Sequence, residues 1–165
     1  MYTTKQIDSA CLKLAQINKL IAIDLELQFY PSPDAPNNFE ELKKYSYKIL
    51  NGLSFPVFSG GSSSAIYGKY DNYVFRAVHD YSHIKTNSSF SKFGECKAID
   101  FHLKELKSYG ASQLVQNLFL VDTVGQVKHY YQFKEFVSNQ REFVYKNLCN
   151  QSALISIKLF FNQYK

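Results

Sequence analysis

The chain has 165 residues, a length typical of one domain with a single sizeable core. Hydrophobic residues make up 45% of it and aromatic residues 16%, which excludes a largely disordered chain because so much aromatic surface must be buried. The net charge is +5, but basic and acidic residues alternate and arginine occurs only at Arg76 and Arg141. We therefore expect no sequence-specific nucleic-acid binding.

The three cysteines, Cys11, Cys96 and Cys149, are far apart in the sequence. Their odd number and the absence of a C-x-x-C pair predict free thiols rather than a disulfide framework or a zinc-thiolate site. The N-terminus has no signal-peptide pattern, and the longest apolar stretch, residues 20–27, contains two acidic residues. We expect a soluble, cytoplasmic protein without a membrane span.

Helical periodicity dominates the chain. It predicts helices at about residues 4–29, 38–51, 72–84, 92–108, 112–131, 136–148 and 152–161. Thr3 or Thr4 is expected to cap the first helix, three prolines within residues 30–36 to end it, and Asp71 to cap the third. These elements predict one all-α domain over residues 1–165, a mainly helical bundle.

Residues 53–71 differ in kind from the rest of the chain. Positions 59–64 read S-G-G-S-S-S, which predicts an irregular loop with at most one pair of short strands, near 55–58 or 65–67. The segment lacks the Lys-Ser/Thr pair of a phosphate-binding P-loop. A surface loop is the favoured interpretation.

A polar stripe marks the helix predicted at 72–84. Asn72, Arg76, His79, Asp80 and His83 fall within about a third of its circumference, and the opposite side is apolar. Surface helices usually expose Lys and Glu instead. The stripe therefore indicates a functional site or a buried polar network.

The spacing of two histidines favours metal binding. His79 and His83 are four residues apart, so their imidazoles can hold one ion, as in His-Glu-x-x-His zinc helices. Here Asp80 takes the place of the Glu, and its shorter side chain weakens a metallopeptidase assignment. Glu95 and His102 share a face of the next helix, and neighbouring helices usually pack together. The candidate metal ligands are His79, His83 and Glu95, with His102, Asp122 and Gln126 as additional candidates.

Three segments resemble a known pattern. Residues 75–83 read F-R-A-V-H-D-Y-S-H, residues 89–98 read S-F-S-K-F-G-E-C-K-A, and residues 122–126 read D-T-V-G-Q. Together they resemble an uncharacterised family encoded by bacteriophages and mobile elements, with the pattern F-R-A-V-H-D-x-x-x-H, G-E-x-x-A and T-x-G-Q. The resemblance covers residues 72–143 and departs from the family at Ser82, often Gly, and Asp122, commonly Glu. It implies a phage-type origin and a working set of His79, Asp80, His83, Glu95 and Gln126, but no reaction.

Two functional interpretations follow. In the first, the protein is a metal-dependent enzyme, most simply a hydrolase, that uses zinc or iron; Asp80 is its general base and Arg76 holds a carboxylate or phosphate of the substrate. In the second, it is a non-enzymatic phage accessory, structural or interaction protein, and the same groups form a buried polar network beside a protein partner's interface. Metal analysis separates the two.

Overall fold

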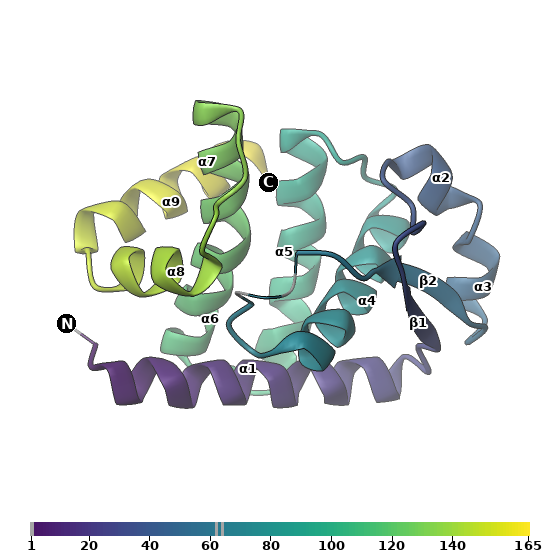
Figure 1. The fold of residues 1–165 in the computed structure, drawn as a ribbon, viewed down its shortest axis with the longest axis horizontal. Coiled ribbons are helices and arrows are strands. Elements are labelled where there is room, and N and C mark those ends of the chain that lie inside the picture. The colour runs from purple at the N-terminus through teal and green to yellow at the C-terminus, as the bar shows by residue number, and fades with distance from the viewer. Residues whose placement is uncertain (1, 62, 64) are drawn as a thin grey trace.

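The long helix α1 (Thr4–Asp24) forms the base of the molecule. The computed structural model describes residues 2–61, 63 and 65–165, and it is mainly helical, as predicted. Helices α4 (Lys69–Thr86), α5 (Lys92–Ser108) and α6 (Gln113–Leu120) pack side by side on α1 (Figure 1). These three helices carry most of the predicted site residues.

Smaller elements flank this central set. Toward the C-terminal end of α1 lie β1 (Phe29–Ser32), α2 (Phe39–Lys43), α3 (Ser46–Leu50) and β2 (Phe55–Phe58) (Figure 1). Toward its N-terminal end lie α8 (Gln140–Leu148) and α9 (Gln151–Tyr164), while α7 (Gln126–Phe133) follows α6 through the π-helical turn η1 (Val121–Gly125). The two strands pair in parallel, with Phe29 opposite Phe55.

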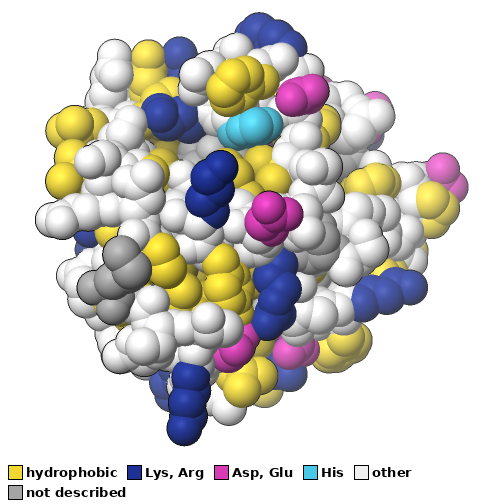
Figure 2. All heavy atoms as spheres, turned by 60° about the vertical axis from the view of Figure 1, so that its left-hand side comes forward, with side chains coloured by type: hydrophobic (Ala, Val, Ile, Leu, Met, Phe, Trp, Pro, Cys, Tyr) yellow, Lys and Arg dark blue, Asp and Glu magenta, His cyan; other side chains and the backbone are white. Residues whose placement is uncertain are grey.

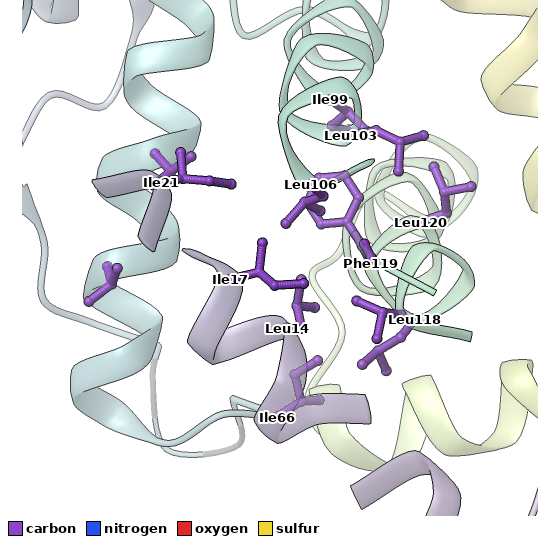
Figure 3. Close-up of a cluster of buried hydrophobic side chains, with 14 of the residues drawn as sticks. Leu14, Ile17, Ile21, Ile66, Ile99, Leu103, Leu106, Leu118, Phe119 and Leu120 are labelled. Carbon is purple, nitrogen blue, oxygen red and sulfur yellow. The ribbon is translucent and has the colours of Figure 1, made fainter. Parts of the chain in front are cut away.

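The buried apolar side chains form one continuous cluster between α1 and the helices above it. Leu14, Ile17 and Ile21 recur at helical spacing on α1 and point toward Leu106 of α5 and Leu118 of α6 (Figure 3). All five are fully buried, and each such side chain contributes about 1.5–3 kcal/mol relative to an exposed one. This packing fixes the positions of the helices that carry the polar stripe.

The first helix is shorter in the structure than the predicted range of residues 4–29. The structure ends α1 at Asp24, Glu26 takes a φ of 52°, and the strand β1 begins at Phe29, the residue at which the helix was predicted to end. Its partner β2 confirms the strand predicted at 55–58, whereas the alternative at 65–67 is not a strand. The conformation of residues 29–32 depends on pairing with a strand distant in the sequence. Helical periodicity carries no information about such pairing.

Other boundaries also differ. The helix predicted at 38–51 is divided into α2 and α3, because the Lys44 and Tyr45 amides bond only three residues back. Helix α4 starts at Lys69 after Gly68, and Asp71, the predicted cap, instead forms an ion pair with Lys19 at 2.7 Å. The helix predicted at 112–131 is interrupted by η1, and the one predicted at 136–148 begins only at Gln140.

The predicted Ser/Gly-rich loop connects β2 to α4. Positions 62 and 64 of that prediction lie outside the described residues. Within the described part, Tyr73 of α4 donates a hydrogen bond to the Ser59 carbonyl at 3.3 Å. The start of the loop is therefore held against α4.

The basic side chains are dispersed over one face of the molecule. Figure 2 shows a face on which Lys and Arg side chains lie apart from one another among apolar and neutral groups. Among the described residues, no helix is both long enough and apolar enough to cross a membrane.

Candidate metal centre

The last turn of α4 and the first turn of α5 come together through a short connection, residues 87–91. Asn87 ends α4 in the left-handed conformation (φ 47°), and Ser91 caps α5 by accepting a hydrogen bond from the Gly94 amide. Glu95 therefore lies near the N-terminus of α5 and beside His83 near the C-terminus of α4. Both helix dipoles favour the charge that each side chain carries when ionised.

Gly94 allows this close turn. A Cβ atom at Gly94 would lie 1.9 Å from the carbonyl oxygen of Ser89, well inside van der Waals contact. The connection can approach α5 this closely only because position 94 has no side chain. The glycine that precedes Glu95 in the sequence is thus needed for steric reasons.

Three side chains converge at this junction, as the sequence predicted. The Nε2 atom of His79 lies 3.1 Å from Glu95 Oε2, and the Nε2 atom of His83 lies 3.5 Å from the same oxygen. Ligand atoms from all three residues lie within 4.8 Å of one another. The geometry therefore allows His79, His83 and Glu95 to share one ion.

A hydrogen bond on the far side of the ring from Glu95 fixes the orientation of His83. Its Nδ1 lies 2.9 Å from the Ser88 carbonyl oxygen, which can only accept, so Nδ1 carries a hydrogen. The opposite atom, Nε2, is buried and has no hydrogen-bond partner among the described residues. A neutral His83 thus presents its lone pair toward a carboxylate, an arrangement that needs either a proton or a cation between them.

The three groups differ in their pKa values. Burial lowers the pKa of His79. Burial also acts to lower the pKa of His83, but the Glu95 carboxylate outweighs it and raises that pKa above its ordinary value. For Glu95, burial alone would raise the pKa, and the two imidazoles lower it below its ordinary value. Glu95 is therefore ionised and His79 neutral, the states in which both bind metal ions, whereas an ion would have to displace the proton that Glu95 favours on His83.

A small pocket opens beside these residues. It has a volume of about 180 Å³, and His79 and Glu95 form part of its wall. Three further residues from the predicted set also line it, namely Arg76, Asp122 and Gln126. The pocket therefore joins the candidate ligands to other groups able to act on a bound molecule.

Asp122 faces this pocket from the π-helical turn. The Tyr67 hydroxyl donates to its Oδ2 atom, and the Gln126 amide donates to its Oδ1 atom at 3.0 Å. Burial raises the pKa of Asp122 to about 6 despite these hydrogen bonds. Asp122 can therefore give or take a proton near neutral pH. The sequence did not indicate this role, because only helical spacing marked Asp122 there, and spacing does not report burial.

Arg76 holds the backbone at the end of β2 through hydrogen bonds. Its Nη1 atom donates to the backbone carbonyls of Phe58 and, at 2.7 Å, of Gly60. It thereby fastens the chain after β2 to the rim of the pocket. Its predicted contact with a substrate stays a prediction.

Two other predicted residues lie off the pocket wall. Asp80 is half-buried, and burial raises its pKa to about 7, but it is not among the residues that line the pocket. His102 is fully buried, with its Nε2 atom 2.7 Å from Asn18 Oδ1 and its ring 4.7 Å from that of Phe119. The structure does not bring His102 into the group of candidate ligands.

The chemistry of this donor set is the remaining guide to function. No family model, curated protein or solved structure matches the chain. Two imidazoles and one carboxylate are donors that suit zinc in catalytic sites and iron(II) in non-haem enzymes.

Proposed function

We propose that the protein is a metal-dependent enzyme, in the first place a hydrolase, in which His79, His83 and Glu95 hold a divalent zinc or iron ion. The observation that carries the proposal is the setting of His83, whose Nδ1 donates to the Ser88 carbonyl while Nε2 faces Glu95 at 3.5 Å. Backbone carbonyls orient metal-binding histidines in this way.

Three protein ligands suit catalysis better than a purely structural site. Catalytic zinc sites commonly have three protein ligands and keep one position for water or substrate. When bound, such an ion lowers the pKa of that water toward neutrality and so supplies a nucleophile. His79 and Glu95 line the pocket, which gives a substrate access to the same position.

Asp122 is the best-placed group for proton transfer. In hydrolysis the water oxygen bonds to the electrophilic carbon or phosphorus atom, and a water proton is passed on to the leaving group. Asp122 lines the pocket and is held by Tyr67 and Gln126, whereas Asp80 lies off its wall. We therefore assign the proton transfer to Asp122, with Asp80 as the second candidate.

The pocket also limits the substrate. Its volume of about 180 Å³ is below the range of about 300–1,000 Å³ typical of sites for drug-sized ligands. Only a small molecule, or the small reactive end of a larger one, fits beside His79 and Glu95.

Metal content tests the site directly. We expect the purified protein, supplied with zinc or iron(II), to hold one ion per chain by elemental analysis, and His83→Ala and Glu95→Gln to lose it. His129→Ala is the matched control, because His129 lies on α7 against Phe133 and outside the candidate ligand group. A metal-free wild type, or unchanged metal in His83→Ala, would leave the buried polar network of a non-enzymatic protein as the better interpretation.

Turnover tests the assignment of the proton-transfer group. On a panel of p-nitrophenyl carboxylic and phosphate esters, Asp122→Asn should keep the metal and lose roughly a hundredfold or more in rate, the usual effect of removing a general base or acid. Asp80→Asn should change the rate far less. The reverse order of the two effects would return the role to Asp80.

We also propose a phage or mobile-element origin and a cytoplasmic location. The resemblance of residues 75–83 and 89–98 to a phage family supports the first. The free thiols of Cys11, Cys96 and Cys149 support the second, because they suit a reducing compartment. Phage genes flanking the coding sequence and recovery of the protein in the cytoplasmic fraction are the corresponding tests.

A further inference from the structure

A buried histidine–asparagine pair lies behind the candidate ligands. His102 of α5 and Asn18 of α1 are both fully buried, and His102 Nε2 lies 2.7 Å from Asn18 Oδ1. An amide oxygen only accepts, so this nitrogen of His102 carries the hydrogen. Full burial favours the neutral form of the ring. The remaining nitrogen, Nδ1, is then an acceptor, and it has no partner among the described residues.

His79 has an unpaired ring nitrogen of the opposite kind, a donor that needs an acceptor. Its Nε2 atom faces Glu95, the position of the proposed ion. Once that nitrogen binds a metal, the other nitrogen, Nδ1, must carry the hydrogen of the neutral ring. This Nδ1 is buried and has no partner among the described residues, and a buried donor without an acceptor is costly. The Ser88 carbonyl orients His83, but within the described part of the chain no backbone carbonyl does the same for His79.

The two rings lie at a distance that suits one intervening water. Their centroids are 6.1 Å apart, too far for a direct hydrogen bond, which needs about 2.7–3.2 Å between the nitrogens. Phe75 contacts both rings, at 5.9 Å from His79 and 5.6 Å from His102, and so keeps them in place. Buried waters typically join polar atoms that the protein itself leaves unpaired.

We propose that His102 is a positioning residue for the metal ligand His79. One buried water accepts the hydrogen of His79 Nδ1 and donates one of its own to His102 Nδ1, while Asn18 fixes the tautomer of His102. This inference rests on the proposed metal site. It explains why a histidine that lies outside the ligand group is buried beside it with one nitrogen unpaired.

Zinc affinity separates this role from simple packing. His102→Phe keeps an aromatic ring between Phe75 and Phe119 but removes the acceptor. We expect zinc affinity, measured by competition with a chromophoric chelator, to fall 10–100-fold, the usual effect of losing such a partner. Asn18→Leu combined with His102→Phe removes both buried polar groups, so the metal-free fold should recover stability while zinc affinity stays low.

Nitrogen NMR of the histidine rings gives an independent readout on the wild type. With zinc bound, His79 should be in the Nδ1–H form, with that hydrogen protected from exchange. Unchanged zinc affinity in a folded His102→Phe variant, or a rapidly exchanging His79 Nδ1–H, would overturn the role of His102 and leave the metal site intact. A wild type that binds neither zinc nor iron(II) would overturn the metal site and this inference together.

Discussion

At the scale of single residues, two histidines one turn apart on α4 have different surroundings. His83 is fully buried and its ring is held by the Ser88 carbonyl, whereas the His79 side chain is 17% exposed and forms part of the pocket wall. Glu95 raises the pKa of His83, while burial lowers that of His79. In the proposed site His83 is thus the anchored ligand and His79 the ligand nearer to the substrate.

Asp122 should make stability depend on pH. Its folded-state pKa of about 6 lies above the ordinary value of 3.8, so the folded chain holds this proton more tightly than the unfolded chain. Its contribution is fully present below about pH 3.8 and is lost as the pH rises through about 6. At pH 7–8 an ionised Asp122 therefore costs on the order of 3 kcal/mol.

The variant Asp122→Asn removes this dependence. We expect it to be more stable than the wild type at pH 7–8 and to show no gain at pH 3.5, in urea unfolding followed by circular dichroism. The exposed Asp34→Asn is the control and should follow the wild type. Parallel stability curves for Asp122→Asn and the wild type would contradict the assigned pKa. A gain in stability with a loss of turnover is typical of a residue kept for function.

At the scale of elements, α4 and α5 work as one unit. The connection at residues 87–91 supplies the Ser88 carbonyl for His83, and α5 supplies Glu95 immediately after Gly94. The proposed metal ligands and the group that orients one of them thus come from a single helix-turn-helix segment. The opposite wall of the pocket comes from η1, where a π-helical turn carries Asp122. Such turns are frequently found at functional sites.

Gly94→Ala tests the dependence on the close turn. The added methyl group would meet the Ser89 backbone at 1.9 Å, so the connection must move. We expect a loss of about 1–3 kcal/mol in the free energy of unfolding, as for other overpacked positions. Zinc affinity should fall as well, because the same movement displaces the Ser88 carbonyl. The exposed Lys97→Ala on the same helix is the control, and equal stability of the two variants would show that the connection adapts without cost.

At the scale of the whole molecule, the distribution of positive charge on the face shown in Figure 2 does not favour a nucleic-acid interface there. Lysines dominate the positive charge and lie dispersed over the face shown in Figure 2. The site proposed here is a small pocket between helices, not a broad surface.

Binding to DNA or RNA should therefore be weak and unspecific. We expect any association to disappear as salt rises from about 50 to 200 mM, because it depends on counterion release alone. Fluorescence anisotropy with labelled single- and double-stranded oligonucleotides measures this. Tight binding to one defined sequence at physiological salt would refute the expectation.

Local patterns in the sequence were enough to predict most helices and the closeness of three polar side chains. The helix predicted at 92–108 is confirmed as α5, and the spacing of His79, His83 and Glu95 predicted their convergence. Hydrogen bonds within a helix join residues four apart, so periodicity and capping residues report them directly. Short connections make neighbours of consecutive helices, and this brought α4 and α5 together in the prediction.

Other features were decided only by tertiary structure. The sequence did not indicate that Phe29–Ser32 forms a strand paired with β2, that a π-helical turn brings Asp122 into the pocket, or that Asp80 lies off its wall. Each depends on contacts between segments far apart in the chain, where packing overrides local propensity. The sequence by itself thus determined which groups could bind a metal, and the packing of α4, α5 and η1 decided which of them share one pocket.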